Sequence, residues 1–264
     1  MKKSIYPWFT GIVGLLCMLV SRPVQAQHFK SNIRDTIVNA KLLSFQYDFQ
    51  LPAFDMAHRF GISQMPGFGF TFKVGHNFLL GLEGGYITGN RVKEDSILRF
   101  IRNDSNEVVG NNGNLTQLLL YESGFYGSLR FGKVFKPFQM FRKWNPNSGI
   151  MAEFGLGFMQ HQIIIRDPEN VVPEVHGEYA KGYDRLSNGI TLSQFIGVLH
   201  LDTHRLKNFY AGINLIEGFT KVRRPYDFAS YGPLSAQRFD MLMGLRAAWI
   251  LPFYGRNEQR FYSY

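Results

Sequence analysis

Charged side chains recur in segments of this chain that are otherwise apolar at every second position. In Phe239–Phe253, Asp240 and Arg246 share one parity, and the other parity is apolar throughout. Because side chains alternate between the faces of a β-strand, such charges would collect in an enclosed interior, where they must pair or find water. A salt-bridged interior that fixes strand register is the favoured interpretation, and a proton or ion path is the alternative. The predicted lumen charge network consists of Asp48, Lys73, Glu83, Glu122, Arg130, Glu153, Asp240 and Arg246.

One histidine is a candidate for catalysis. An enzyme would need a nucleophile and a base near a membrane face, and His161 has Ser187 and Ser193 on the expected neighbouring strand. However, His161 lies on the interior parity and no spacing defines a triad, so we favour a hydrogen-bonded polar histidine. We therefore predict no catalytic residue, no metal and no cofactor, because metal-ligand spacing is absent among the dispersed histidines His58, His176, His200 and His204.

Two basic segments are candidates for surface contacts. Lys221, Arg223 and Arg224 open the last long loop, where they would meet lipid headgroup phosphates. The alternative for these three cations is a solvated basic loop.

The second segment, Val134–Ser148, is both basic and aromatic. Its aromatic residues recur at helical spacing and predict a short amphipathic helix. Docking to a periplasmic or membrane partner is one interpretation, and a turn lying on the inner leaflet is the other. The predicted partner-docking residues are Phe138, Phe141, Arg142, Lys143 and Trp144.

The elements that must position these residues are strands with a period of two. A strand of a soluble protein averages about five or six residues, whereas a strand that crosses a membrane needs about nine to eleven. Short and long connections alternate between the segments, which is typical of outer-membrane barrels. The pattern predicts an all-β, eight-stranded antiparallel up-and-down transmembrane β-barrel with strands at Lys41–Leu51, Gly67–Val74, Phe78–Thr88, Gln117–Lys133, Gly149–Gln162, Gly189–Leu201, Phe209–Phe219 and Phe239–Phe253.

The N-terminus predicts export. Lys2 and Lys3 precede the apolar run Gly11–Val20, and Val24-Gln25-Ala26 resembles a cleavage site, so residues 1–26 read as a secretory signal peptide. The lone Cys17 would leave with it, and the exported chain would have no disulfide. Residues 27–40 form a periplasmic lead-in, 41–254 the barrel and 255–264 a C-terminal tail. The net charge of +9 is carried by scattered basic residues, which argues against a nucleic-acid partner.

The signal peptide, the aromatic strands and the terminal strand Phe239–Tyr254 together resemble the small Gram-negative outer-membrane β-barrel superfamily. Asn145–Gly149 and Lys181–Leu186 are similar to segments of uncharacterised members. Members of the superfamily usually end on the aromatic residue of the last strand, which assembly machinery reads. Here Gly255–Tyr264 follows, so either Phe253 or the final Phe261–Tyr264 would carry this signal.

The resemblance implies an outer-membrane location with both termini periplasmic, and contact with lipid and lipopolysaccharide. The superfamily includes structural proteins, adhesins, lipid enzymes and accessory subunits. Our leading expectation is a non-enzymatic structural or accessory subunit of an envelope secretion, assembly or transport complex, with envelope protein partners. The alternatives are a ligand-binding protein or adhesin that uses Arg91–Asn114 and Pro168–Asn188, and a lipid-modifying enzyme that uses His161.

Overall fold

The computed structural model describes residues 37–105, 107–136, 145–202, 206–229, 231–232 and 237–254. Several predicted features lie outside these ranges: the signal peptide, residues 27–36 of the lead-in, and the tail 255–264. The same holds for the partner-docking residues Phe138, Phe141, Arg142, Lys143 and Trp144.

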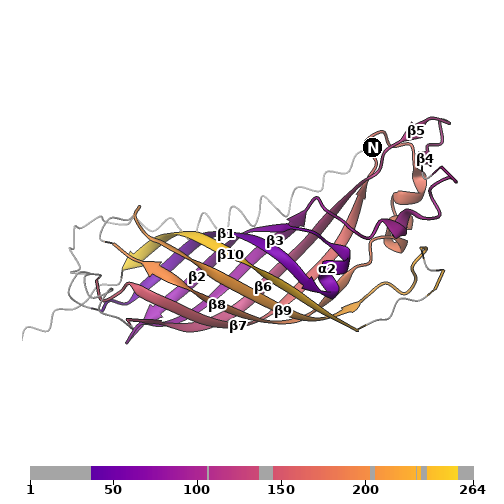
Figure 1. The fold of residues 1–264 in the computed structure, drawn as a ribbon. Helices are drawn as coiled ribbons and strands as arrows, with labels where there is room; N and C mark the ends of the chain where they lie inside the picture. Colours follow the sequence, from indigo (N-terminus) through magenta and orange to yellow (C-terminus); the bar gives the residue numbers. More distant parts are fainter. Residues whose placement is uncertain are drawn as a thin grey trace, which may run out of the picture. The chain divides into compact units, whose positions relative to one another are not determined.

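The described strands form a closed antiparallel ring of eight, in the order β1-β10-β9-β8-β7-β6-β3-β2 (Figure 1). Each strand pairs with its sequence neighbour in the ring, and β1 pairs with β10 to close it. The predicted fold class is therefore confirmed, with most strands longer than expected. They are β1 Ala40–Phe54, β2 Ser63–Val74, β3 Phe78–Gly89, β6 Leu119–Phe135, β7 Gly149–Arg166, β8 Ser187–His200, β9 Phe209–Val222 and β10 Gln237–Tyr254.

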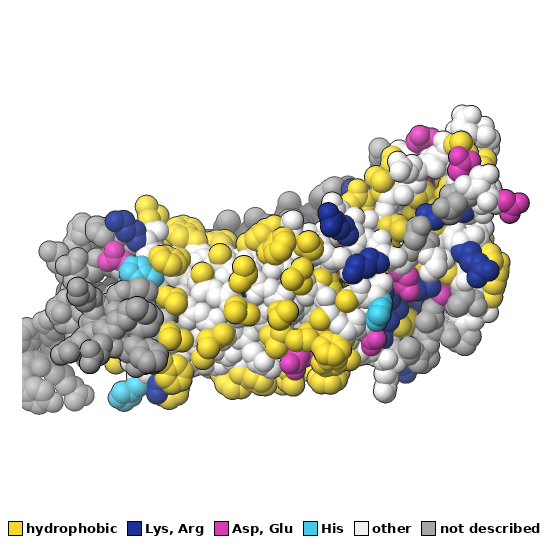
Figure 2. All heavy atoms as spheres, viewed as in Figure 1, with side chains coloured by type: hydrophobic (Ala, Val, Ile, Leu, Met, Phe, Trp, Pro, Cys, Tyr) yellow, Lys and Arg dark blue, Asp and Glu magenta, His cyan; other side chains and the backbone are white. Residues whose placement is uncertain are grey.

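The side chains that alternate along each strand face the interior and the exterior of the barrel in turn. On β1, Phe45 and Tyr47 are 50% and 48% exposed, whereas Gln46 and Asp48 between and beside them are buried. Figure 2 shows outward apolar side chains over the middle of the visible face, with most charged side chains of that face toward the two ends. Such an exposed apolar band is stable against lipid chains, and it is the outward face expected of a transmembrane barrel.

Cross-strand pairs hold the register. Phe45 lies opposite Trp249 across the closing pair of strands, with ring centroids 6.0 Å apart. On the other side of the ring, Phe131 of β6 and Phe154 of β7 pair with centroids 5.3 Å apart. Aromatic cross-strand contacts of this kind stabilise a sheet and face the lipid here.

The two ends of the barrel differ. At the turn end, β2 and β3 are joined by the short turn Gly75–Asn77, and Asn77 has a positive φ of 66°. At the opposite loop end, the long connections contain small elements: α2 Asp55–Arg59, η1 Asp95–Leu98, β4 Val108–Val109, β5 Leu115–Thr116, η3 Pro173–Val175 and η4 Tyr179–Gly182.

The segment Pro52–Pro66, which lies between the first two predicted strands, contains the end of β1, the helix α2 and the start of β2. Met56 and Phe60, four residues apart, are both fully buried. Their burial in the mouth of the barrel holds α2 in place, because a single helical turn is not stable alone.

Side chains fill the barrel interior in layers. An apolar cluster that includes Leu42 and Leu199 lies toward the turn end, and a second that includes Met65 and Met159 lies toward the loop end. Charged and amide side chains occupy the middle. An eight-stranded barrel is just wide enough to be filled in this way. No helix among the described residues is long and apolar enough to cross a membrane.

Candidate functional site

The centre of the lumen is built around Arg246 of β10. Its guanidinium donates to both carboxylate oxygens of Asp48, from Nε at 2.7 Å and from Nη2 at 2.8 Å. The remaining terminal nitrogen, Nη1, donates to Glu83 at 2.6 Å. Asp48 and Arg246 are direct cross-strand partners, so the strand register alone brings them together. This two-point contact is the strong form of an arginine–carboxylate pair.

Glu83 connects this pair to a second arginine. Arg130 of β6 donates to Glu83 Oε1 at 3.0 Å and to Oε2 at 2.9 Å, and its Nε lies 3.7 Å from Glu153. Asn214 bridges the two halves, since its amide nitrogen donates to Asp48 at 2.9 Å and its oxygen accepts from Arg130 at 3.3 Å. We call Asp48, Glu83, Arg130, Glu153 and Arg246 the lumen network.

The side chains of the lumen network are paired and buried. The side chains of Arg246 and Asp48 are 1% and 0% exposed, and both arginine guanidiniums lie 6.0 Å from the ring centre of Phe195. Removing Arg246 would leave the buried Asp48 without a cation, which is far costlier than the net gain from the pair. The network therefore joins β1, β3, β6, β7 and β10 across the middle of the lumen.

Three predicted members lie apart from this network, because they stand at other heights along their strands. Lys73, opposite Ala40 at the turn end, donates to the Val38 carbonyl at 2.9 Å and to Asn147 Oδ1 at 2.8 Å. Glu122 is buried near the loop end, opposite Gly89 of β3. Asp240 is buried near the loop end of β10 and binds His161. The eight predicted residues thus form separate groups inside one barrel.

His161 is fully buried. Its Nε2 lies 2.9 Å from Asp240 Oδ2, an oxygen that also accepts from Thr220, and Phe60 packs edge-on against the ring at a centroid distance of 5.6 Å. Ser187, opposite His161 in the β7–β8 register, instead accepts from Arg59 at 3.1 Å. The imidazole therefore lies in the lumen against Phe60, and not on a lipid-facing surface.

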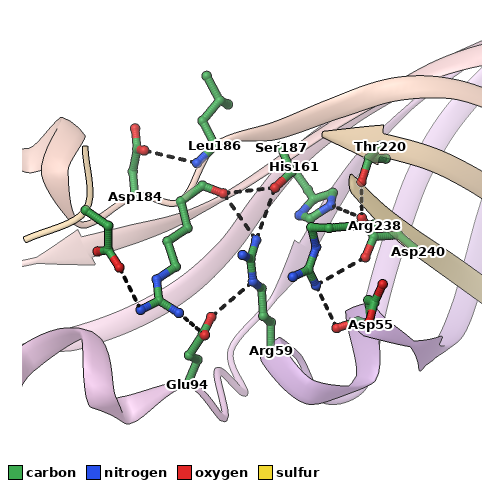
Figure 3. Close-up of polar contacts among 12 residues, drawn as sticks. Asp55, Arg59, Glu94, His161, Asp184, Leu186, Ser187, Thr220, Arg238 and Asp240 are labelled. Carbon is green, nitrogen blue, oxygen red and sulfur yellow. Dashed lines mark hydrogen bonds and ion pairs between the residues drawn. The ribbon is translucent and has the colours of Figure 1, made fainter. Parts of the chain in front are cut away.

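Above this level, ion pairs join the four connections of the loop end (Figure 3). Arg185 pairs with Glu94 and with Asp227, the latter at 3.1 Å, and Arg59 of α2 lies 3.1 Å from Glu94. Arg59 also donates to the Arg185 carbonyl at 3.3 Å. Burial lowers the pKa of Arg185, and the charge of Asp227 opposes that shift. We call Arg59, Glu94, Arg185 and Asp227 the mouth cluster.

The alternation of apolar and polar residues does not reveal the mouth cluster, since its members lie in connections without a repeating pattern. The one available signal was the pair Met56 and Phe60 at helical spacing, which places Arg59 on a short helix. Asp184, the neighbour of Arg185 in the chain, does not belong to the mouth cluster. Asp184 instead accepts from the Leu186 amide at 3.1 Å and pairs with Arg224.

The predicted headgroup residues have different environments. Lys221 is exposed on the outer face at the end of β9. Arg223 donates to Asn188 at 2.5 Å. Arg224 donates from Nε to both oxygens of Asp184, at 2.8 and 3.0 Å, and this hydrogen bonding raises the pKa of Arg224. Among these three residues, Lys221 is therefore the one whose charged group faces outward and receives no such hydrogen-bond partner from the described residues.

Among the described residues, no group of three or more His, Cys, Asp or Glu side chains is placed to hold a metal ion. The charged side chains of the lumen network pair across the lumen, and those of the mouth cluster pair across the loop end.

Comparison with known proteins returns distant structural likenesses. Ail, the attachment invasion locus protein of Yersinia pestis, shares 8% identity at a TM-score of 0.43, covering 82% of this chain and 100% of that one. Neisserial surface protein A shares 11% identity at 0.41, covering 81% and 97%. A major outer membrane protein from Thermus thermophilus shares 11% at 0.42, covering 81% and 99%. No protein-family model and no curated protein matches the chain.

The class of this protein follows from its own architecture. A closed ring of eight long antiparallel strands, an outward apolar band and a side-chain-filled interior define a small outer-membrane β-barrel.

Proposed function

We propose that the protein is a non-enzymatic, non-conducting barrel that serves as a structural or accessory subunit of an envelope secretion, assembly or transport complex. The observation that carries this proposal is the paired lumen network between two apolar layers. A barrel filled in this way offers the membrane a rigid anchor and offers partners its ends. In the proposed orientation both termini are periplasmic and the loop end is external, because outer-membrane barrels place their long loops outside.

The mouth cluster supports the same proposal. It links α2 to the connections that carry Glu94, Arg185 and Asp227. Connections fixed by buried ion pairs present a preorganised surface, and binding to such a surface costs less ordering entropy. On the periplasmic side, the proposed contact is the basic and aromatic segment within Val134–Ser148.

Cross-linking in intact cells, followed by purification of the barrel in mild detergent, tests the accessory role. We expect a stoichiometric envelope protein to be recovered with the wild-type chain and lost with F138A/F141A/W144A. The matched control is F125A/F131A/F158A, which removes three aromatic side chains from the lipid-facing band. Recovery of the barrel alone from wild-type cells, or equal recovery with both triple variants, would overturn the proposal.

A second function, recognition of an external ligand, is favoured by one specific feature. Phe100 and Tyr231 come from two different loops, are 45% and 65% exposed, and pack with ring centroids 4.3 Å apart. The guanidinium of Arg99 lies 5.4 Å from the Phe100 ring centre. Exposed aromatic and arginine side chains dominate binding surfaces. If this second proposal holds, cells that carry F100A/Y231A should adhere less than wild-type cells. Unchanged adhesion would refute it.

A further inference from the structure

A short strand-like pairing outside the barrel ring orients two cations at the loop end. The Gly61 amide donates to the Arg91 carbonyl at 2.7 Å, and the Lys93 amide donates to the Arg59 carbonyl at 2.7 Å. Between these bonds, Phe60 and Val92 are bridge partners, and both pack against the apolar cluster of the loop end. Because side chains alternate, Arg91 and Lys93 both point to the outside.

These two cations line a groove of about 250 Å³. Its apolar wall includes Leu51 and Ile62, which are 47% and 37% exposed and continue the lipid-facing band. Its floor depends on Gly61, since a Cβ there would lie 2.8 Å from Arg91 Cβ. The groove is therefore apolar on the side of the membrane and basic on the side of the loops.

The charges of the groove differ from those of its surroundings. Arg59, Arg185 and Arg224 each have a carboxylate partner. Within the described part of the chain, no carboxylate forms an ion pair with Arg91 or Lys93. Lys93 donates to the Ala57 carbonyl at 2.9 Å, which fixes the ammonium beside the groove and leaves further donors for a ligand.

We propose that this groove binds a phosphate group of lipopolysaccharide, with Arg91 and Lys93 on the phosphate and an acyl chain along Leu51 and Ile62. A guanidinium and an ammonium are the donors that phosphate oxygens prefer. The adjoining apolar wall selects an anion that carries a hydrocarbon chain over a free anion. This site needs no protein partner, and it rests only on the placement of the barrel in the outer membrane with the loop end outward.

The test is native mass spectrometry of the full folded barrel titrated with purified lipopolysaccharide in detergent. Replacing both cations, R91A/K93A, should weaken retention at least about tenfold, the scale of one charge-assisted hydrogen bond. The matched control K41A/K207A removes two exposed cations from the turn end, away from the groove, and should change retention by less than about twofold. R91K/K93R, which keeps both charges, should retain the lipid.

Two further arms separate the sources of the anion. Dephosphorylated lipopolysaccharide should bind as weakly to the wild type as intact lipid binds to R91A/K93A, and inorganic phosphate at matched concentration should not compete. Wild-type retention by R91A/K93A, equal losses in the control, or displacement by inorganic phosphate would each overturn the proposal. Unchanged heat-modifiable gel mobility verifies that every variant is folded, and co-purification of a protein partner is scored separately.

Discussion

Arg246 is the residue of the lumen network whose replacement should have the largest effect on the free energy of unfolding. Replacement by methionine, R246M, keeps much of the side-chain volume but removes two hydrogen bonds to Asp48 and one to Glu83. Glu83 keeps Arg130, whereas Asp48 keeps only amide donors such as Asn214, 2.9 Å away. A buried carboxylate left without its cation costs about 3–5 kcal/mol. We therefore expect R246M to lower the free energy of unfolding by that amount.

Two companion variants separate lost pairing from lost packing. R130M should cost less, about 1–3 kcal/mol, because Glu83 still accepts from Arg246 and Glu153 loses only a contact of 3.7 Å with Arg130 Nε. The double variant D48N/R246M leaves no unpaired charge at position 48. It should be more stable than R246M alone by about 1–3 kcal/mol, the range of coupling between residues in contact.

Urea titration of the barrel in lipid vesicles measures these differences, with tryptophan fluorescence and heat-modifiable gel mobility as independent probes. The reasoning is refuted if R246M stays within about 1 kcal/mol of the wild type, which is an ordinary cost for any substitution. It is also refuted if D48N/R246M is no more stable than R246M.

Three further predictions concern other parts of the molecule. L245R places a charge in the lipid-facing band and should cost about 2–4 kcal/mol in the same titration, whereas F100R at the loop end should cost almost nothing; equal effects would contradict a membrane-facing band. R185M leaves the buried Asp227 unpaired and should speed proteolysis of the loop-end connections while barrel mobility on gels stays unchanged; unaltered cleavage would show that the mouth cluster does not hold the loops. Burial alone would raise the pKa of Asp167, but hydrogen bonds from the Val172 amide and His176 outweigh it and lower that pKa. Asp167 therefore stabilises the folded state at pH values above its pKa in the unfolded chain, about 3.9, and this stabilisation is lost as the pH falls through the pKa in the folded state. In the wild type, the resistance of the 167–176 segment to protease should decrease in acid. In D167N, that resistance should not change with pH.

The ring of strands was accessible from sequence because period two is a local property. Each segment of β1 or β10 reports its own inside and outside through alternating side chains, and no knowledge of neighbours is needed. The cross-strand pair of Asp48 and Arg246 needs more, namely the register of two strands from opposite ends of the chain. A one-residue slip of either strand would turn its charged side chain to the lipid, so register is strongly specified once the barrel closes.

The grouping of the charged residues within the lumen could not be predicted from the sequence in the same way. Parity places Lys73, Glu122 and Asp240 inside, but it does not give their heights along the barrel axis. Height follows from strand tilt and stagger, which are set by the whole ring. Arg59 and Glu94 lie in connections without a period, and they meet only because Phe60 and Val92 pair across two such connections.

The pairing of β1 with β10 has a consequence for the order in which this protein can be made. Asp48 and Arg246 are separated by 198 positions in the chain, so the first strand to leave the export channel must wait for the last. During that wait β1 has an open edge and an uncompensated carboxylate, a state prone to aggregation. Closure satisfies both at once, since the same step that completes the backbone ladder supplies the guanidinium. The ion pair at the middle of the lumen then forms in the last step of folding, when the barrel closes. A chain truncated before Arg246 would lack both the strand edge and the guanidinium that closure requires.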